Sequence, residues 1–217
     1  MFCKRSGYTR SELKNKDHQK PLIDGEIRGH GIWWGKLLSG KVKKGEFIRQ
    51  KKDGSVFWIH ATYTRVINQN GECTGIIKVA QNITVSRLEE LEKRYKSRAI
   101  NIAQGIIEFD VNGCILKANK NFLRICKFSL HEIKGLHHQE LCEEEYVNSS
   151  EYRELWKNLR KGDFVNERFK RVGKNKLPFW IHATYCPLRD TYGNVYKINK
   201  YAYNITDEII SSQISKK

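Results

Sequence analysis

The chain contains the same seven-residue stretch twice. Phe-Trp-Ile-His-Ala-Thr-Tyr occupies residues 57–63 and again residues 179–185. The similarity runs without a gap from residues 34–84 to residues 156–206, at a constant offset of 122 positions. Each copy closes with Asn-Ile-Thr. Because this period is far longer than a solenoid repeat, the sequence predicts two copies of one domain.

The two copies differ at their N-terminal ends. Residues 104–111 and 114–119 have the pattern of two strands joined by an Asn-Gly turn, and a helix containing Phe122 follows. Met1 aligns with residue 121, so the first copy lacks the opening strands in this sequence. A truncated gene is the favoured interpretation; a misplaced start codon and a sheet completed by a partner are the alternatives.

Each copy continues with three predicted strands joined by tight turns. They cover residues 46–50, 56–67 and 74–81 in the first copy, and residues 168–172, 179–188 and 195–203 in the second. Alternation places Phe57, Ile59, Ala61 and Tyr63 on one face of the strand. This face is the more apolar, so we expect it to face the core. His60 and His182 are then expected on the outer face.

A helix is predicted between the copies. Its apolar stripe at helical spacing consists of Leu88, Leu91, Tyr95, Ala99 and Ile102. Ser86 and Glu89 have the spacing of a capping box, which predicts where this helix begins. The stripe favours a homodimer, with packing on its own domain as the alternative.

The chain is strongly basic, with a formal net charge of +16. Such a charge suits nucleic acid or anionic lipid as a partner. The basic residues are spread over both copies, and no recognition helix, zinc finger or RNA-binding signature accompanies them. A solvated lysine-rich surface is therefore the favoured interpretation, and no nucleic-acid partner is predicted.

Several classes of protein are disfavoured by what the sequence lacks. No apolar run approaches the roughly 20 residues of a membrane helix, and no signal peptide follows Met1. The six cysteines do not coincide between the copies, which favours reduced thiols in a cytoplasmic chain. No nucleophile stands with a base in a catalytic pattern, so no enzymatic activity is predicted.

Specific residues resemble a known family. They are Asn119 and Phe122, residues 128–135, Trp156 and the closing Asn-Ile-Thr. Together they resemble tandem PAS domains of bacterial methyl-accepting chemotaxis proteins, which include energy- and redox-sensing receptors. The resemblance implies an α+β fold in which each domain has a five-stranded antiparallel sheet of order 2-1-5-4-3 with short helices on one face. The expected organisation is domain 1 at residues 1–84, a linker helix at 85–102, domain 2 at 103–206 and an outgoing signalling helix at 207–217.

The resemblance also implies a ligand pocket beneath the short helices. His137 and His138 lie at this place in the sequence, and Phe122 and Trp156 are further candidates for contact with a cofactor. Imidazole is a usual haem ligand, so His137 or His138 as an iron ligand is one hypothesis, with structural packing as the alternative. No other metal site is predicted. The cofactor is left open between haem and flavin, although the flavin-adduct segment Asn-Cys-Arg-Phe of light sensors is absent.

The closing segments are predicted to relay a signal. The resemblance implies that Asn82 and Thr84, and likewise Asn204 and Thr206, couple the last strand to the following helix. Thr206 or Asp207 can cap that helix, so a shift of the strand would pass into it through the cap. A plain helix cap without a relay is the alternative.

These expectations define a sensory module. It would bind a small ligand or cofactor and signal to chemotaxis proteins or to an output domain absent from this sequence. The alternative is a protein-interaction scaffold without a cofactor, which would use the basic surface and an exposed strand edge.

Overall fold

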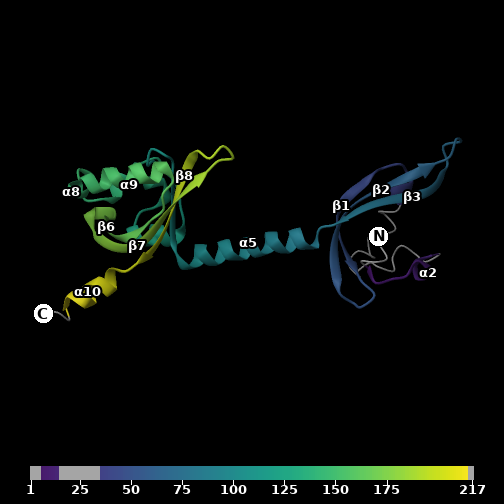
Figure 1. Ribbon diagram of the computed structural model, residues 1–217, viewed down its shortest axis with the longest axis horizontal. Helices are drawn as coiled ribbons and strands as arrows, with labels where there is room; N and C mark the ends of the chain where they lie inside the picture. The colour runs from purple at the N-terminus through teal and green to yellow at the C-terminus, as the bar shows by residue number, and fades with distance from the viewer. Residues whose placement is uncertain (1–5, 15–34, 215–217) are drawn as a thin grey trace. The chain divides into compact units, whose positions relative to one another are not determined.

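The computed structural model describes residues 6–14 and 35–214 and divides the chain into two compact units, residues 1–94 and 95–217 (Figure 1). Residues 18 and 34, which the repeat pairs with His138 and Trp156, lie outside the described residues. None of the helices in the described part of the chain is both long enough and apolar enough to cross a membrane.

The second unit contains a five-stranded sheet with the order β5-β4-β8-β7-β6, in which all paired strands are antiparallel. The strands are β4 (Gly105–Phe109), β5 (Ile115–Ala118), β6 (Val165–Val172), β7 (Pro178–Arg189) and β8 (Val195–Asn204). This order confirms the predicted 2-1-5-4-3 arrangement. The neighbouring strands β4 and β8 come from the N-terminal and C-terminal parts of the unit, so the five-stranded sheet forms only when both parts are present.

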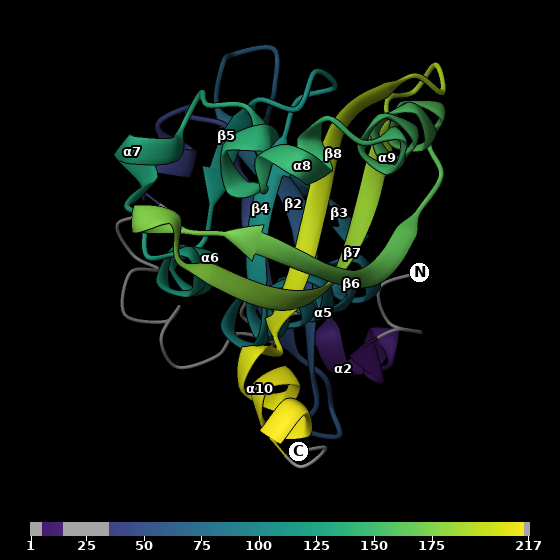
Figure 2. The same cartoon turned by 90° about the vertical axis from the view of Figure 1, so that its left-hand side faces the viewer.

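Short helices cover one face of this sheet (Figure 2). They are α6 (Lys120–Cys126), α7 (Leu130–Ile133), the 3-10 helix η1 (His138–Leu141), α8 (Glu144–Val147) and α9 (Ser150–Lys161), while the 3-10 turn η2 (Lys174–Lys176) joins β6 to β7. The longest, α9, begins where the Ser149 hydroxyl accepts a hydrogen bond from the Tyr152 amide, and it ends at Gly162 with φ +98°. Trp156 is buried on its inner side.

Strand alternation places the core of the second unit between the sheet and these helices. On β7 the side chains of Ile181, Ala183 and Tyr185 are buried, whereas His182 between them is exposed. The predicted inward face and the predicted outward histidine are therefore confirmed in this copy.

The first unit forms a three-stranded antiparallel sheet of order β1-β2-β3 in its described residues. The strands are β1 (Lys43–Gln50), β2 (Val56–Ile67) and β3 (Cys73–Asn82), and the short helix α2 (Arg10–Leu13) precedes them. The repeated stretch is again buried on its predicted face, at Phe57, Ile59, Ala61 and Tyr63. Strands β1 and β6 begin three residues earlier than predicted, because backbone pairing continues into polar residues such as Lys43 and Asn166. Strands β4 and β5 are shorter than predicted.

One helix follows β3, and the prediction of its start was wrong. Helix α5 spans Thr84–Ala103, so Ser86 and Glu89 lie inside it rather than at a capping box. The Asn82 side-chain oxygen accepts a hydrogen bond from the Thr84 amide at 2.9 Å. This bond satisfies an amide that the helix itself cannot satisfy, and the helix begins three residues earlier than the Ser86–Glu89 spacing predicts. None of its residues is buried.

Candidate functional site

His138 lies at the centre of the core of the second unit. It is the first residue of η1, and its side chain is fully buried. Its Nδ1 atom is 3.2 Å from the Tyr152 hydroxyl, and its Nε2 atom is 3.0 Å from the Tyr185 hydroxyl. The rings of Phe109 and Trp156 meet its imidazole edge to face, with centroids 5.3 and 5.4 Å away. Hydrogen bonds and ring contacts together hold this imidazole in one position.

Arg171 on β6 extends this network. Its guanidinium donates a hydrogen bond to the Tyr185 hydroxyl at 3.3 Å and another to the Lys170 carbonyl at 2.8 Å. It also stands between two rings, 4.4 Å from the centroid of Phe169 and 4.9 Å from that of Tyr146. Arg171 is nevertheless 1% exposed, so a permanent positive charge is held inside the domain.

Only one donor of this network is fixed by its chemistry: the Arg171 guanidinium donates to the Tyr185 hydroxyl. The neutral imidazole of His138 carries one proton, so one of its two ring nitrogens donates to a tyrosine hydroxyl and the other accepts from one. A continuous chain of hydrogen bonds thus runs from β6 through β7 and η1 to α9.

Lys200 on β8 is the second buried basic residue. Strand pairing places it opposite Ile107 on β4 and Tyr185 on β7, in one row across the sheet. Its Nζ atom lies 5.1 Å from the ring centroid of Tyr185 and 5.4 Å from that of Phe122. The side chain is fully buried, and Nζ has no hydrogen-bond partner among the described residues.

Burial keeps the other titratable groups of the cluster neutral. Loss of water, followed by the charges of Arg171 and Lys200, lowers the pKa of His138 well below 6.5. Burial raises the pKa of Tyr185 to about 12, against the opposing effect of Arg171. Burial also raises the pKa of the Cys142 thiol. The same loss of water, with the nearby charge of Arg171, lowers the pKa of Lys200 well below 10.5.

The other predicted histidine, His137, lies outside this network. Its Nε2 atom is 2.7 Å from the carbonyl oxygen of Asn112, and its Nδ1 atom accepts from the Gln139 amide, so the ring caps η1. The close contact between the His137 ring and this turn requires glycine at residue 113. Its φ is +90°, and a Cβ atom there would lie 2.8 Å from His137 Nε2. This histidine fixes the turn after β4.

The arrangement does not fit a haem. Both ring nitrogens of His138 face hydroxyl groups, and both ring nitrogens of His137 face backbone groups. Aromatic rings pack against the remaining faces of His138. Neither imidazole therefore offers a nitrogen to an iron ion in this structure. Phe122 and Trp156, the other candidate cofactor residues, are buried core residues at 0% and 3% exposure.

Sequence reasoning missed most of the polar cluster. It did not select Arg171, Tyr185 or Lys200, nor Tyr152 and Cys142 beside them. A signal was present, because the offset of 122 pairs the first three with Arg49, Tyr63 and Lys78. The first unit repeats the arrangement: the Arg49 guanidinium donates to the Tyr63 hydroxyl at 3.0 Å, and Lys78 Nζ lies 5.3 Å from the Tyr63 ring centroid. Basic residues at inward strand positions in both copies were the available evidence.

The closing Asn-Ile-Thr segment ties the sheet to the next helix. Thr206 is the first residue of α10 (Thr206–Ile214), with Asp207 in its first turn. The Thr206 hydroxyl accepts from the Trp180 amide on β7 at 2.9 Å and donates to the Asn204 side chain at 2.6 Å. The Asn204 side chain in turn accepts from the Thr206 amide at 3.0 Å. Asn204, rather than Thr206 or Asp207, thus satisfies the first amide of the helix, and Thr206 bonds to the neighbouring strand.

The same contacts recur in the first unit. The Thr84 hydroxyl accepts from the Trp58 amide on β2 at 2.9 Å. The Asn82 side chain accepts from the Thr84 amide, as Asn204 does from Thr206. In each copy the outgoing helix is therefore attached to the strand that carries the repeated stretch.

Comparison with known proteins places this geometry in a family. The family model described as PAS domain matches residues 1–85 and 103–207. The biofilm dispersion protein BdlA of Pseudomonas aeruginosa is 32% identical over 211 residues, covering 96% of this chain and 50% of the relative. The nitrogen fixation regulatory protein of Klebsiella oxytoca is 24% identical over 135 residues, covering 58% of this chain and 26% of the relative. The chain thus spans about half and about a quarter of the length of these two relatives.

Solved structures that resemble this chain share little sequence with it. A PAS domain from Colwellia psychrerythraea covers 52% of this chain and 97% of its own, at 15% identity and a TM-score of 0.46. An RNA-binding light-oxygen-voltage receptor covers 90% of this chain and 88% of its own, at 10% identity and a TM-score of 0.45. The family model covers most of both units, and the chain belongs to the PAS domain family, with two PAS domains in tandem.

Proposed function

We propose that this chain is a cytoplasmic, non-enzymatic sensory module in which the core of the second PAS domain binds a small ligand and strand β7 passes the change to α10. Membership in the PAS family and similarity to the biofilm dispersion protein support a signalling role. The resemblance to chemotaxis receptors supports a chemotaxis-type output. Helix α5, between the matched regions, supports the division into domains at 1–84 and 103–206, with 85–102 as the linker and 207–217 as the outgoing helix.

One observation carries this proposal. Strand β7 contacts the polar cluster at one position and the outgoing helix at another. Tyr185 on β7 bonds to Arg171 and His138, while Trp180 on the same strand donates its amide hydrogen to Thr206. A ligand that displaces the Tyr185 hydroxyl would move β7 and thereby alter the attachment of α10. For this the ligand needs only to bind more tightly to one of two positions of β7 than to the other.

Thr206→Ala is expected to loosen the start of α10. The variant leaves the Trp180 amide without its partner, which costs about 1–2 kcal/mol and corresponds to roughly tenfold faster exchange of the amides in the first turn of the helix. Hydrogen-exchange mass spectrometry of the whole chain measures this. Thr84→Ala is the matched control and should affect the start of α5 instead. Unchanged exchange in α10 after Thr206→Ala would remove the attachment on which the relay depends.

The linker helix supports a homodimer as the working state of the module. Leu88, Tyr95 and Ile102 are each at least 60% exposed, and they follow one stripe of α5. Pairing with the same stripe of a second copy would remove this apolar surface from water.

We expect the chain to sediment as a dimer at micromolar concentration and Leu88→Lys to shift it to the monomer, because a charge would then lie in the apolar seam. Lys93→Glu, another charge change on the same helix, is the control for a nonspecific effect. A monomeric wild-type chain across this concentration range contradicts the dimer.

A further inference from the structure

Two basic side chains share the core of the second PAS domain without a buried acidic partner among the described residues. Lys200 and Arg171 are 0% and 1% exposed, and no Asp or Glu among the described residues is buried. Lys200 Nζ and Arg171 Nε are both buried and have no hydrogen-bond partner there. Buried donors of this kind are costly, because each loses water and gains nothing in return.

The buried groups around Lys200 and Arg171 do not supply a negative charge. The titratable neighbours inside the core are Cys126 on α6, His138 on η1, Cys142 after η1, Tyr146 on α8, Tyr152 on α9 and Tyr185 on β7, while Glu143 and Glu167 act on Cys142 and Tyr146 from outside the core. Burial raises the pKa of each thiol and each phenol and lowers that of His138, so all six are neutral near pH 7. The core therefore offers donors to an anion and lacks one of its own.

We propose that this core binds the carboxylate group of a small organic acid between Lys200 and Arg171. This assignment rests on the proposed function and names its ligand class. A carboxylate has two oxygens with which to accept from Lys200 Nζ and from Arg171 Nε. The rings of Phe122 and Tyr185 beside Nζ suit an apolar or planar body next to the charge.

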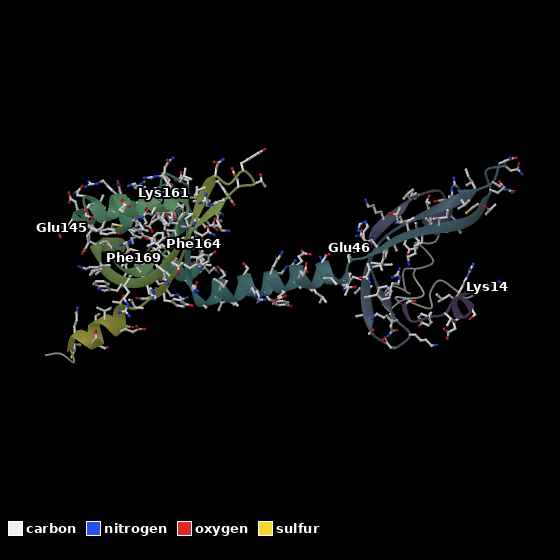
Figure 3. The ribbon with its side chains drawn as sticks, viewed as in Figure 1. Lys14, Glu46, Glu145, Lys161, Phe164 and Phe169 are labelled. Carbon is white, nitrogen blue, oxygen red and sulfur yellow. The ribbon has the colours of Figure 1, made fainter. Side chains whose placement is uncertain are left out.

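A surface groove lies next to the two rings that enclose Arg171. It has a volume of about 600 Å³ and lies between α9 and β6. Its walls include Tyr146 and Phe169, the two rings that enclose the Arg171 guanidinium (Figure 3 labels Phe169). Movement of the half-buried Tyr146 ring would open the groove to the guanidinium. Glu151, Glu154 and Glu167 line the same groove together with Arg168, so the entrance carries charges of both signs and its carboxylates would slow the entry of an anion.

Binding would be coupled to a proton. Burial and the charge of Arg171 lower the pKa of Lys200, and this favours the neutral amine in the free protein. A carboxylate beside the amine favours the ammonium form instead. At a pH where the free amine is neutral, the complex would therefore take up a proton at Lys200 Nζ, and the anion and the ammonium group would neutralise each other.

The test uses benzoate and its uncharged analogue benzamide as probes of the whole chain. Isothermal titration near pH 7 is expected to show benzoate binding with proton uptake, seen as different heats in Tris and HEPES buffers, and no benzamide binding. Lys200→Met is expected to weaken benzoate binding about tenfold or more and to abolish the proton uptake. Lys200→Gln repeats the test with a polar side chain. Lys78→Met, the equivalent change in the first domain, is the matched control and should leave this binding intact.

Three outcomes overturn the inference. Absence of benzoate binding, or unchanged binding in both Lys200 variants, shows that no carboxylate site exists at Lys200. Equal binding of benzoate and benzamide shows that the core takes neutral ligands; the ligand-binding function then stands while the anion site falls. The attachment of α10 is measured without any ligand through Thr206→Ala, so failure of the relay is seen separately.

Discussion

Phe122→Ala is expected to lower the free energy of unfolding of the second PAS domain by about 3–5 kcal/mol. Phe122 is 0% exposed, and its amide donates to the Asn119 side chain at 2.8 Å, which fixes the start of α6. Gly105 allows α6 to approach β4 closely, since a Cβ atom there would lie 3.2 Å from the Phe122 Cα atom. This rigid contact cannot collapse around the missing ring, so the variant leaves a cavity beside Lys200.

Hydrogen-exchange mass spectrometry of the β7 and β8 amides measures this loss for the second domain alone, because peptides from the first domain are followed separately. Phe164→Ala is the matched control, since the Phe164 ring is 66% exposed just before β6 (Figure 3). A change of less than about 0.5 kcal/mol is expected for the control. Equal losses in the two variants would show that Phe122 does not pack in the core as described.

The stability of the second domain is expected to fall as the pH drops below 6.5. Burial, with the charges of Arg171, Lys200 and His137, lowers the pKa of His138 well below 6.5 in the folded state. The unfolded chain therefore binds a proton at this residue in a range where the folded chain does not. Since stability rises with pH wherever the unfolded state holds more protons, it is lost on acidification, by up to about 1.4 kcal/mol per pH unit.

The slope of the unfolding free energy against pH should disappear when the His138 imidazole is replaced. His138→Gln cannot titrate and should remove this contribution between about pH 5 and 6.5, while His182→Gln on the exposed face should keep it. Exchange of β7 and β8 amides at several pH values, corrected for the intrinsic pH dependence of exchange, gives the slopes. An unchanged slope in His138→Gln would show that His138 is protonated in the folded domain.

Much of the fold was predictable because it depends on local patterns that occur twice. Alternation along β7 identified Ile181, Ala183 and Tyr185 as inward residues, and they are buried. The helix boundary at Ser86 was not predictable from spacing, because the side chain of Asn82 competes for the first amide of α5. That competition depends on the geometry at the end of β3, which a capping pattern alone does not include.

The sequence prediction named His138 and two of the rings beside the cluster, Trp156 and Phe122, but none of its hydrogen-bond partners. Motif reasoning selected histidines because they ligate cofactors, and this placed His137 beside His138 as an equal candidate. The structure separates them, since His137 faces the backbone of the turn after β4 and His138 faces Tyr152 and Tyr185. The partners of His138 are distant in sequence and meet only when β7 and α9 pack together.

The proposed relay requires that β7 couples the polar cluster to α10, and Tyr185→Phe tests this coupling most directly. The variant removes the hydroxyl that bonds Arg171 and His138, and hydrogen-exchange mass spectrometry then follows the first turn of α10. We expect faster exchange there in Tyr185→Phe, no additional change when Thr206→Ala is also present, and no effect on α10 from the equivalent Tyr63→Phe. Exchange in α10 that is the same in wild type and Tyr185→Phe would contradict the coupling of core and helix.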